Sequence, residues 1–374
     1  MEQNDYLILS EDGKTVIGCN SDYEGVVVIP EGVTEIGESA FEECTKINAI
    51  TIPSSVTKIG TRAFEECTSL TSIVIPNSVM KIEAGTFSGC KSLTSIKIPD
   101  GVTAIEDNVF FGCKSLTSIK IPNNVRYIGD AAFSGCTSLK SIDIPKGVRS
   151  MGHVAFSNCT SLTSIKIPSS LTNMTNIAFV GCKKLKEIIV DEGNHSYCSF
   201  DGALFSKDME CLIFVPGGKT TFTFPNNEFA TCERTFDDCT KLKELIVAQD
   251  HPRLRSINGV LYSNDGPELV RFPMGRKTFE IPSYVTKIGY GAFANCTRLI
   301  SIVIPDSVET IGWRAFASCT HLTEVHLKHN LPIDFSEAFE DSVIPNVTLY
   351  VPKGSSEAYR KHEFFSKFKE IIEE

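Results

Sequence analysis

Hydrophobic residues recur along this chain with a period of 23 residues, which is longer than the period of a helix or a strand. Residues 70–92 read LTSIVIPNSVMKIEAGTFSGCKS, and residues 93–115 read LTSIKIPDGVTAIEDNVFFGCKS. The shared pattern, L-x-x-I-x-I-P-x-x-V-x-x-I-G-x-x-A-F-x-x-C-x-x, returns through most of the chain. A period of about 20–50 residues indicates one supersecondary unit stacked on copies of itself. We therefore predict a repeat solenoid, in which residues 23 positions apart are neighbours in one apolar wall.

Each repeat divides into a strand, a turn and a compact apolar segment. In L-x-x-I-x-I the β-branched residues alternate onto one face, and the following Pro ends the strand because it has no N–H to donate. V-x-x-I adds a second inward-facing apolar pair, and A-F supplies the bulk of the core on the opposite wall. We predict one parallel strand per coil, stacked at about 4.8 Å into a curved sheet. Short helical or 3-10 turns are expected on the other side, in the β-rich, α+β manner of leucine-rich repeats.

The register divides one continuous solenoid domain into five segments: residues 1–29, 30–190, 191–281, 282–340 and 341–374. The first segment contains a hairpin turn signal, Asp12-Gly13, and is expected to be an N-terminal β-hairpin cap. The second and fourth are regular repeats. The third holds two units with a 57-residue period, each resembling a longer coil with an inserted β-hairpin.

The last segment predicts a strand and then an amphipathic helix that runs through Ile372, with Ser355 or Ser356 as its N-cap. Such a helix would place its apolar residues over the open end of the stack as a C-terminal cap. A helix that binds a partner is the alternative.

Charge and hydropathy exclude several classes of partner. The formal net charge is −10, which argues against nucleic acid, whose phosphates require a basic face. No apolar run approaches the roughly 18 residues of a membrane helix, so we expect no membrane insertion. The amino terminus has neither the basic nor the apolar region of a signal peptide. The chain is therefore either cytosolic or a secreted protein from which a signal was removed.

The 14 cysteines do not predict a disulfide framework, because most of them occupy one site of the repeat. That site holds Cys44, Cys67, Cys90, Cys113, Cys136, Cys159, Cys182, Cys239, Cys296 and Cys319. Equivalent residues point the same way, whereas a disulfide needs convergent side chains. We expect a ladder of reduced, buried thiols that fill apolar space. Cys19, Cys198, Cys211 and Cys232 lie off the ladder, and Cys198 with Cys211 could form a local bridge.

Catalytic and metal-binding motifs are absent from the sequence. It contains no phosphate-binding loop, dinucleotide fingerprint, nucleophile elbow or H-E-x-x-H motif. His321, His326 and His329 are close in sequence, but we do not expect them to converge at the roughly 2 Å that zinc ligands require. We predict no catalytic residue, no metal and no cofactor, and hence no enzyme.

The strand face offers the first candidate binding site. One outward column reads Ser72, Ser95, Ser118, Ser141 and Ser164. The next column contains Lys97, Lys120, Asp143 and Lys166. Solenoids commonly bind partners on their concave surface, so a short lysine stripe on an acidic protein could take an acidic protein or a sulfated glycan. Ordinary solvated strand positions are the alternative interpretation.

Tyr290 and Trp313 are the second candidate. They are 23 residues apart, at a site that elsewhere holds Glu38, Thr61, Asp130 or His153. Adjacent large aromatic side chains can form a contact patch, because Trp and Tyr are enriched among interface anchors. Packing of both rings on the second insert is the alternative.

The repeat L-x-x-I-x-I-P-x-x-V-x-x-I-G-x-x-A-F-x-x-C resembles the BspA-like class of leucine-rich repeats from about Val26 to the end of the chain. The inserts FDGALFSKD and INGVLYSND and the closing LYVPKGSSEAY are similar to that family as well. The resemblance implies a surface-displayed or secreted protein of bacteria or protists. It implies adhesion or recognition through the concave sheet, with a protein or glycan as ligand, host extracellular matrix among them. The alternative function is a structural scaffold or spacer, intracellular or not, without a ligand of its own.

Overall fold

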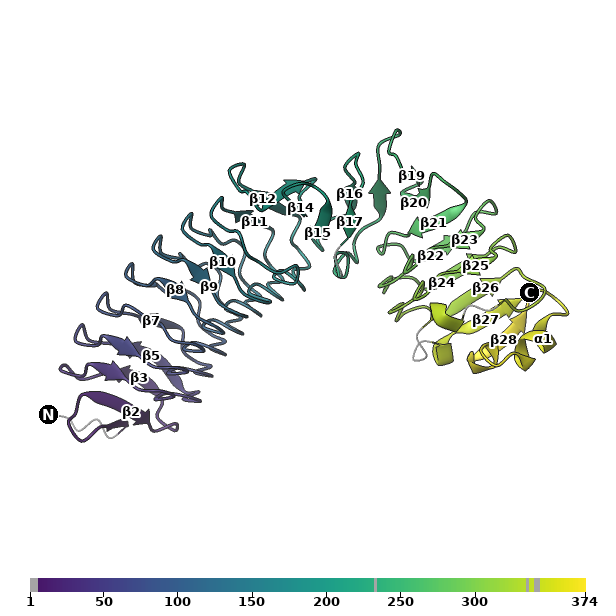
Figure 1. Ribbon diagram of the computed structural model, residues 1–374. Coiled ribbons are helices and arrows are strands. Elements are labelled where there is room, and N and C mark those ends of the chain that lie inside the picture. Colours follow the sequence, from purple (N-terminus) through teal and green to yellow (C-terminus); the bar gives the residue numbers. More distant parts are fainter. Residues whose placement is uncertain (1–5, 232–233, 334–335, 340–343) are drawn as a thin grey trace. The chain divides into compact units, whose positions relative to one another are not determined.

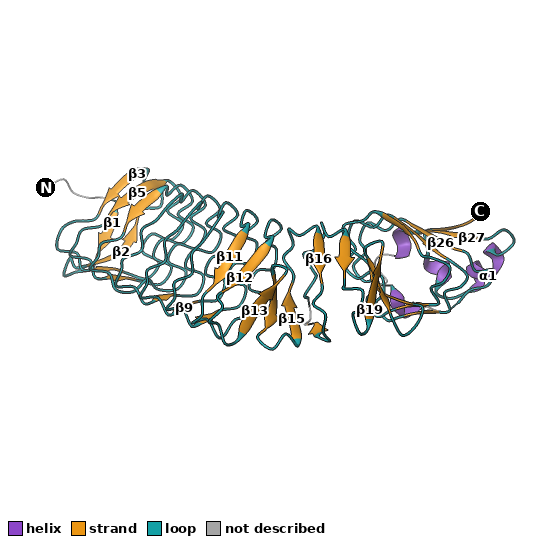
Figure 2. Ribbon diagram, turned by 90° about the horizontal axis from the view of Figure 1, so that it is seen from above, coloured by secondary structure: helices purple, strands orange, loops and turns teal. Residues whose placement is uncertain are grey.

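Stacked coils of β-structure make up the chain, and Figures 1 and 2 show these coils following one another in chain order. The computed structural model describes residues 6–231, 234–333, 336–339 and 344–374. The chain divides into two compact units: Met1–Pro216 with Ala230–Asp238, and Gly217–Phe229 with Cys239–Glu374. Within the described part, the helical segments all lie after residue 335, near the C-terminal end (Figure 2). No helix in these ranges has the length and hydrophobicity needed to cross a membrane.

The L-x-x-I-x-I segments of the first unit stack in parallel, which confirms the predicted solenoid. The regular strands of this stack are β3 (Gly25–Val28), β5 (Ile47–Thr51), β7 (Ser72–Val74), β11 (Ser164–Ile167) and β12 (Glu187–Val190). Pairing places Val28, Thr51 and Val74 side by side in three successive coils. Single parallel bridges then continue the same register to Lys166.

The V-x-x-I segments form a second parallel ladder, so each coil has two strand positions where we predicted one. In the first unit this ladder contains β4 (Glu35–Ile36), β6 (Lys58–Ile59), β8 (Ala104–Ile105), β9 (Tyr127–Ile128) and β10 (Ser150–Met151). These strands are two residues long, and the chain then turns toward the A-F segment at a Gly in four coils and at Glu106 after β8. The A-F-x-x-C segments form turns, in which Cys44 N–H donates to Phe41 O within the coil and Phe41 N–H donates to Ala63 O of the next coil.

The phenylalanines of the repeat form a continuous stack, as the period predicts. Phe41, Phe64, Phe87, Phe110, Phe133, Phe156 and Phe179 have successive ring centroids 5.2–6.0 Å apart and are at most 1% exposed. In the second unit, Phe293 stacks on Phe316 at 5.0 Å and Phe316 on Phe339 at 4.7 Å. Residues 23 positions apart are therefore stacked neighbours in a common core.

The cysteine ladder is buried and reduced, and its thiols do more than fill space. In seven of the ten ladder positions Sγ lies 3.1–3.2 Å from the main-chain oxygen of the Phe in the preceding coil, as in the Cys136 to Phe110 hydrogen bond. The same oxygen accepts an N–H bond from within its own turn. The ladder thus ties neighbouring turns together. Cys198 and Cys211 do not form the local disulfide bridge that the sequence allowed, and Cys232 lies outside the described residues.

Native alkylation should separate the two classes of cysteine. Burial raises the pKa of the Cys136 thiol to about 12 and that of Cys296 to about 12, so neither forms the reactive thiolate near pH 8. We expect iodoacetamide to label the half-buried Cys198 and Cys211 first, because they are more accessible, and fully buried ladder thiols such as Cys136 and Cys296 only in denaturant. Peptide mass spectrometry at several reaction times measures this order. Rapid native labelling of Cys136 would contradict the assignment.

The first insert is a β-hairpin, as predicted, and its third strand rejoins the solenoid. β13 (Tyr197–Phe200) and β14 (Ala203–Ser206) are antiparallel, and β15 (Cys211–Phe214) pairs with β14 and, in parallel, with β17 (Ala230–Thr231). Phe214 then lies 6.1 Å from Phe179, at the next place in the Phe stack. The 57-residue unit therefore contains one long coil and one short coil, where the sequence suggested a single extended coil.

The second insert repeats this arrangement in the second unit. β19 (Leu254–Ile257), β20 (Val260–Ser263) and β21 (Glu268–Arg271) are antiparallel, and β21 pairs in parallel with β23 (Lys287–Ile288), followed by β25 (Thr310–Ile311). Phe272 stacks 4.9 Å from Phe293. The L-x-x-I-x-I segments also pair in parallel after each insert. After the first insert β16 (Thr221–Thr223) pairs with β18 (Glu244–Ile246), and after the second β22 (Thr278–Glu280) pairs with β24 (Ser301–Ile304).

At the N-terminal end, β1 (Leu7–Leu9) and β2 (Thr15–Cys19) form an antiparallel hairpin, and β2 pairs with β4 of the first coil. At the other end the structure corrects the predicted long helix. After β26 (Glu324–Leu327) and β27 (Thr348–Val351), helix α1 spans only Ser356–Lys361. A 3-10 turn and β28 (Glu370–Glu373) follow it.

The C-terminal tail forms a strand because it extends the parallel ladder. β28 pairs with β27 through four residue pairs, including Leu349 with Ile371, and satisfies an edge strand that a helix would leave open. Ser355 is the N-cap residue, but its hydroxyl makes no capping bond, and Glu373 Oε1 accepts the Ser356 N–H instead. Phe364, Phe365, Phe368 and Ile371 are nevertheless buried, at 0–7% exposure.

Candidate functional site

The strand face of the first unit presents an unbroken column of outward side chains. We call it the strand-face column: Val28, Thr51, Val74, Lys97, Lys120, Asp143, Lys166 and Ile189. Alternation along each strand explains its exposure, because Ile73 and Ile75 turn inward while Val74 between them is 72% exposed. The structure thus brings Lys97, Lys120, Asp143 and Lys166 together in adjacent coils, with apolar residues at both ends of the column.

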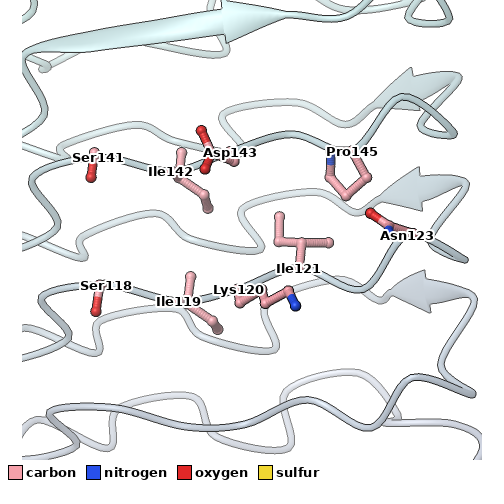
Figure 3. Close-up of a pocket in the computed structure, with 9 residues that line it drawn as sticks. All are labelled: Ser118, Ile119, Lys120, Ile121, Asn123, Ser141, Ile142, Asp143 and Pro145. Carbon is pink, nitrogen blue, oxygen red and sulfur yellow. The ribbon is translucent and has the colours of Figure 1, made fainter.

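A second column lies two residues earlier in each strand and consists of small hydroxyl side chains. It contains Ser72, Ser95, Ser118, Ser141 and Ser164. Between two coils the columns enclose an open pocket, in which Ser118 and Ser141 lie at one side and Asn123 and Pro145 at the other (Figure 3). Lys120 and Asp143 stand between these two sides, so an ammonium and a carboxylate occupy successive coils of the same pocket.

Two lysines of the strand-face column form no ion pair with any described residue. Lys166 Nζ lies 3.9 Å from Asp191 Oδ2, and Lys91 and Lys81 on other faces also form ion pairs. Within the part of the chain that the structure describes, neither Lys97 nor Lys120 has such a pair, although the two are bridged neighbours. Like charges side by side on a sheet are unfavourable, and an anionic ligand would relieve this repulsion.

Further lysines border the serine column, and the sequence analysis missed them. Lys140 immediately precedes Ser141 of the serine column, and Lys186 immediately precedes Glu187, which pairs with Ser164 in the next coil. The neighbouring coils have Thr117 and Thr163 at the positions of these two lysines. Lys140 N–H donates to Thr117 O, and Lys186 N–H donates to Thr163 O. Both lysines therefore keep the main-chain hydrogen bond that joins neighbouring coils at this position of the repeat. Both side chains are exposed. Aligning the threonine positions of successive repeats would have found them.

The second unit holds the aromatic patch, which we define as Tyr290, Trp313 and Arg314. The two rings are 69% and 51% exposed, with centroids 5.6 Å apart and planes inclined by 31°. The Arg314 guanidinium carbon lies 5.4 Å from the centre of the Trp313 ring. The two rings therefore contact each other and remain exposed to solvent. They are not part of the core of this unit, which contains the stacked Phe293 and Phe316 rings.

Backbone hydrogen bonds between coils hold the aromatic patch in place. Gly291 N–H donates to Trp313 O at 3.2 Å, and Phe293 N–H donates to Ala315 O at 2.8 Å. Gly312 precedes Trp313 at a close approach of two coils, where an added Cβ would lie 2.6 Å from Tyr290 N. This glycine lets the two aromatic residues occupy adjacent coils.

The three histidines considered for a metal site have separate environments. His326 Nδ1 lies 2.9 Å from Glu374 Oε2, and its ring stacks 4.3 Å from Tyr350. His329 is buried, and its Nε2 lies 2.8 Å from Val308 O. His321 is exposed, with Nδ1 3.3 Å from Thr320 Oγ1. Among the described residues, no group of three or more His, Cys, Asp or Glu side chains is suited to hold a metal ion.

Comparison with known protein families agrees with the repeat found in the sequence and in the fold. A family model described as BspA type Leucine rich repeat region (6 copies) matches residues 20–125, 103–214 and 273–362, which together exceed half of the chain. A search of curated proteins found no match.

Two solved structures share the fold. One is a leucine rich cell surface protein from Faecalibacterium prausnitzii A2-165, with 24% identity over 98% of this chain and 92% of that protein, at a TM-score of 0.51. The other is a leucine-rich repeat protein from Bacteroides ovatus ATCC 8483, with 27% identity over 94% of this chain and 99% of that protein, at a TM-score of 0.55.

Proposed function

Because the chain belongs to the BspA-type leucine-rich repeat family, we propose that it is a non-enzymatic recognition or adhesion module. Its ligand would be a matrix protein or a glycan bound on the strand face of the first unit. The observation that carries this proposal is the pair of adjacent lysines, Lys97 and Lys120, which have no carboxylate partner among the described residues. On a chain of net charge −10, two ammonium groups in register, neither of them in an ion pair within the described residues, form a local site for an anionic ligand.

We place the protein at the cell surface or outside the cell. The F. prausnitzii protein with this fold is described as a cell surface protein, which supports the location. A rigid stack of coils suits display, because each coil is held by its neighbours and a broad side-chain surface stays open.

The aromatic patch is a second proposed contact site. Trp, Tyr and Arg are the residue types most enriched among the hot spots of protein interfaces, and all three lie together here. Nothing in the fold requires aromatic side chains at this position, because other coils carry Glu38, Thr61 or Asp130 at the same place in the repeat.

Changing Lys97 and Lys120 together to Glu should abolish or strongly weaken ligand binding. A double charge reversal in the strand-face column turns attraction for an anionic group into repulsion, and we expect a loss of at least about tenfold in affinity. Binding to immobilised fibronectin, to fibrinogen and to a glycan array measures the effect. Lys114→Glu with Lys184→Glu is the matched control, since it changes the net charge equally at exposed lysines outside the column.

Equal binding by both double variants would reject the strand-face site. A chain that binds none of the tested ligands, even when its own far-UV spectrum is intact, would favour the scaffold or spacer function instead.

A further inference from the structure

We infer that the strand-face column and the serine column bind a linear sulfated or uronic-acid-containing glycan that lies along the solenoid axis, across successive coils. This inference rests on the proposed function and specifies the ligand chemistry of the same site. Three features carry it. They are the lysines on both sides of the serine column, the small serine hydroxyls between them, and Asp143, the one carboxylate of the strand-face column.

The basic borders follow both sides of the serine column. Lys97, Lys120 and Lys166 lie on one side, and Lys140 and Lys186 on the other. Between them the serine side chains are small, so the lysine stems rise above a shallow floor. A chain that runs along this floor meets a cation on one side or the other in nearly every coil. The ligand is therefore extended, and it carries repeated negative charge.

Asp143 favours a glycan over polymers that carry a negative charge at every step. It interrupts the column between Lys120 and Lys166, and it lines the pocket with Ser118, Ser141 and Asn123. A polymer with a charge at every step would set an anion against this carboxylate, as nucleic acid or polyglutamate would. A glycan alternates sulfate or carboxylate groups with hydroxyls, and a hydroxyl can donate a hydrogen bond to Asp143. Serine hydroxyls and the Asn123 amide can bond the remaining sugar oxygens.

Two other classes of ligand fit less well. Neither column contains an aromatic residue, whereas single-stranded nucleic acid is held by stacking on aromatic side chains. An extended peptide usually binds by adding a strand to a sheet edge. Here the main-chain groups face neighbouring coils, as Thr117 N–H donating to Thr94 O illustrates. From Val74 to Lys166 each coil is bridged to the next, so this part of the face offers side chains for binding, which favours a polysaccharide.

The test compares a heparin oligosaccharide with unsulfated dextran, polyglutamate and a single-stranded oligonucleotide at about 0.15 M salt, where long-range attraction is largely screened. We expect the heparin oligosaccharide to bind at least about tenfold more tightly than any of the others. Lys97→Gln with Lys120→Gln should weaken this binding, and the double Glu variant should weaken it further. The Lys114→Glu, Lys184→Glu control should bind as the unchanged protein does.

Asp143 gives a second, independent readout. Asp143→Lys should strengthen binding of polyglutamate and of the oligonucleotide much more than binding of heparin, because it replaces the carboxylate between Lys120 and Lys166 by a third cation. Equal affinity for heparin and polyglutamate in the unchanged protein would overturn the inference. If no glycan binds but a matrix protein does so through Lys97 and Lys120, the glycan assignment falls and the proposed function stands. If the lysine variants alter neither, both fall.

Discussion

Replacing Phe110 by Ala should destabilise the first unit by about 3–5 kcal/mol, the usual cost of removing a buried aromatic ring. The Phe110 ring is fully buried between Phe87 at 5.8 Å and Phe133 at 5.3 Å. Its removal leaves a cavity that two rigid neighbouring coils cannot close, because their turns are held by main-chain bonds such as Phe110 N–H to Ala132 O. Urea unfolding followed by circular dichroism measures the loss.

The adjacent residue supplies a control for that experiment. Phe111 is 45% exposed, so Phe111→Ala removes a ring of the same size from the surface and should cost about 1 kcal/mol or less. Hydrogen exchange should locate the damage, since a solenoid coil interacts mainly with its neighbours. We expect faster exchange near Phe87 and Phe133 and unchanged exchange in the second unit. Equal costs for the two substitutions would contradict the stacked core.

The sequence predicted the parts of the fold that repeat in phase. Phe64 and Phe87 stack because one period separates them, and the thiol ladder follows from the same count. Phe214 and Phe272 were missed because each follows an inserted hairpin, so the distance to the preceding Phe no longer equals the period. A two-residue strand such as Lys58–Ile59 is too short to show an alternating pattern, which hid the second ladder. The five-segment domain division stays a prediction.

The C-terminal tail shows why a local pattern can indicate the wrong element. Phe364, Phe365, Phe368 and Ile371 have helical spacing, and the sequence therefore favours a helix. The edge of β27 offers main-chain partners to Glu370–Glu373 at the end of this segment, and pairing such as that of Leu349 with Ile371 makes this end a strand. That edge exists only after the preceding coils have stacked, so a local sequence window does not contain it.

The sequence likewise predicted some features of the candidate site and missed others. Periodicity placed Lys97, Lys120, Asp143 and Lys166 in one column, because only register was needed. It could not show that Lys166 is close to Asp191 while Lys120 is not paired, because that depends on where the chain turns after β12. Exposure of Tyr290 and Trp313 likewise depends on neighbouring coils and on the path of the second insert.

A buried polar residue, Asn194, joins the first insert to the solenoid. Its replacement is the second change from which we expect a large loss of stability. Asn194 is fully buried, and its Nδ2 donates to Pro168 O and Leu171 O, both at 2.8 Å. Its Oδ1 accepts the N–H groups of Ser196 and Tyr197, also at 2.8 Å. One side chain thus joins the first insert to the preceding coil and shapes the start of β13.

Asn194→Ala should cost about 3 kcal/mol, because it removes four hydrogen bonds between a fully buried side chain and the main chain, each worth roughly 1 kcal/mol. The second insert provides the comparison, since His251 stands one 57-residue period later. His251 is 3% exposed, and its Nδ1 accepts the N–H groups of Arg253 and Leu254 at 3.2 and 3.1 Å. Its Nε2 has no hydrogen-bond partner in the described structure.

His251→Asn should therefore be tolerated or stabilising, because the Asn oxygen can replace Nδ1 while its amide reaches toward Pro225 and Glu228, the counterparts of Pro168 and Leu171. We expect stability within about 1 kcal/mol of the unchanged protein, or above it. Urea unfolding of both variants, with hydrogen exchange at β13–β14 and β19–β20, measures the contrast. If Asn194→Ala is as mild as His251→Asn, the buried amide does not anchor the insert, and the hairpin would then be held by strand pairing and by its apolar contacts alone.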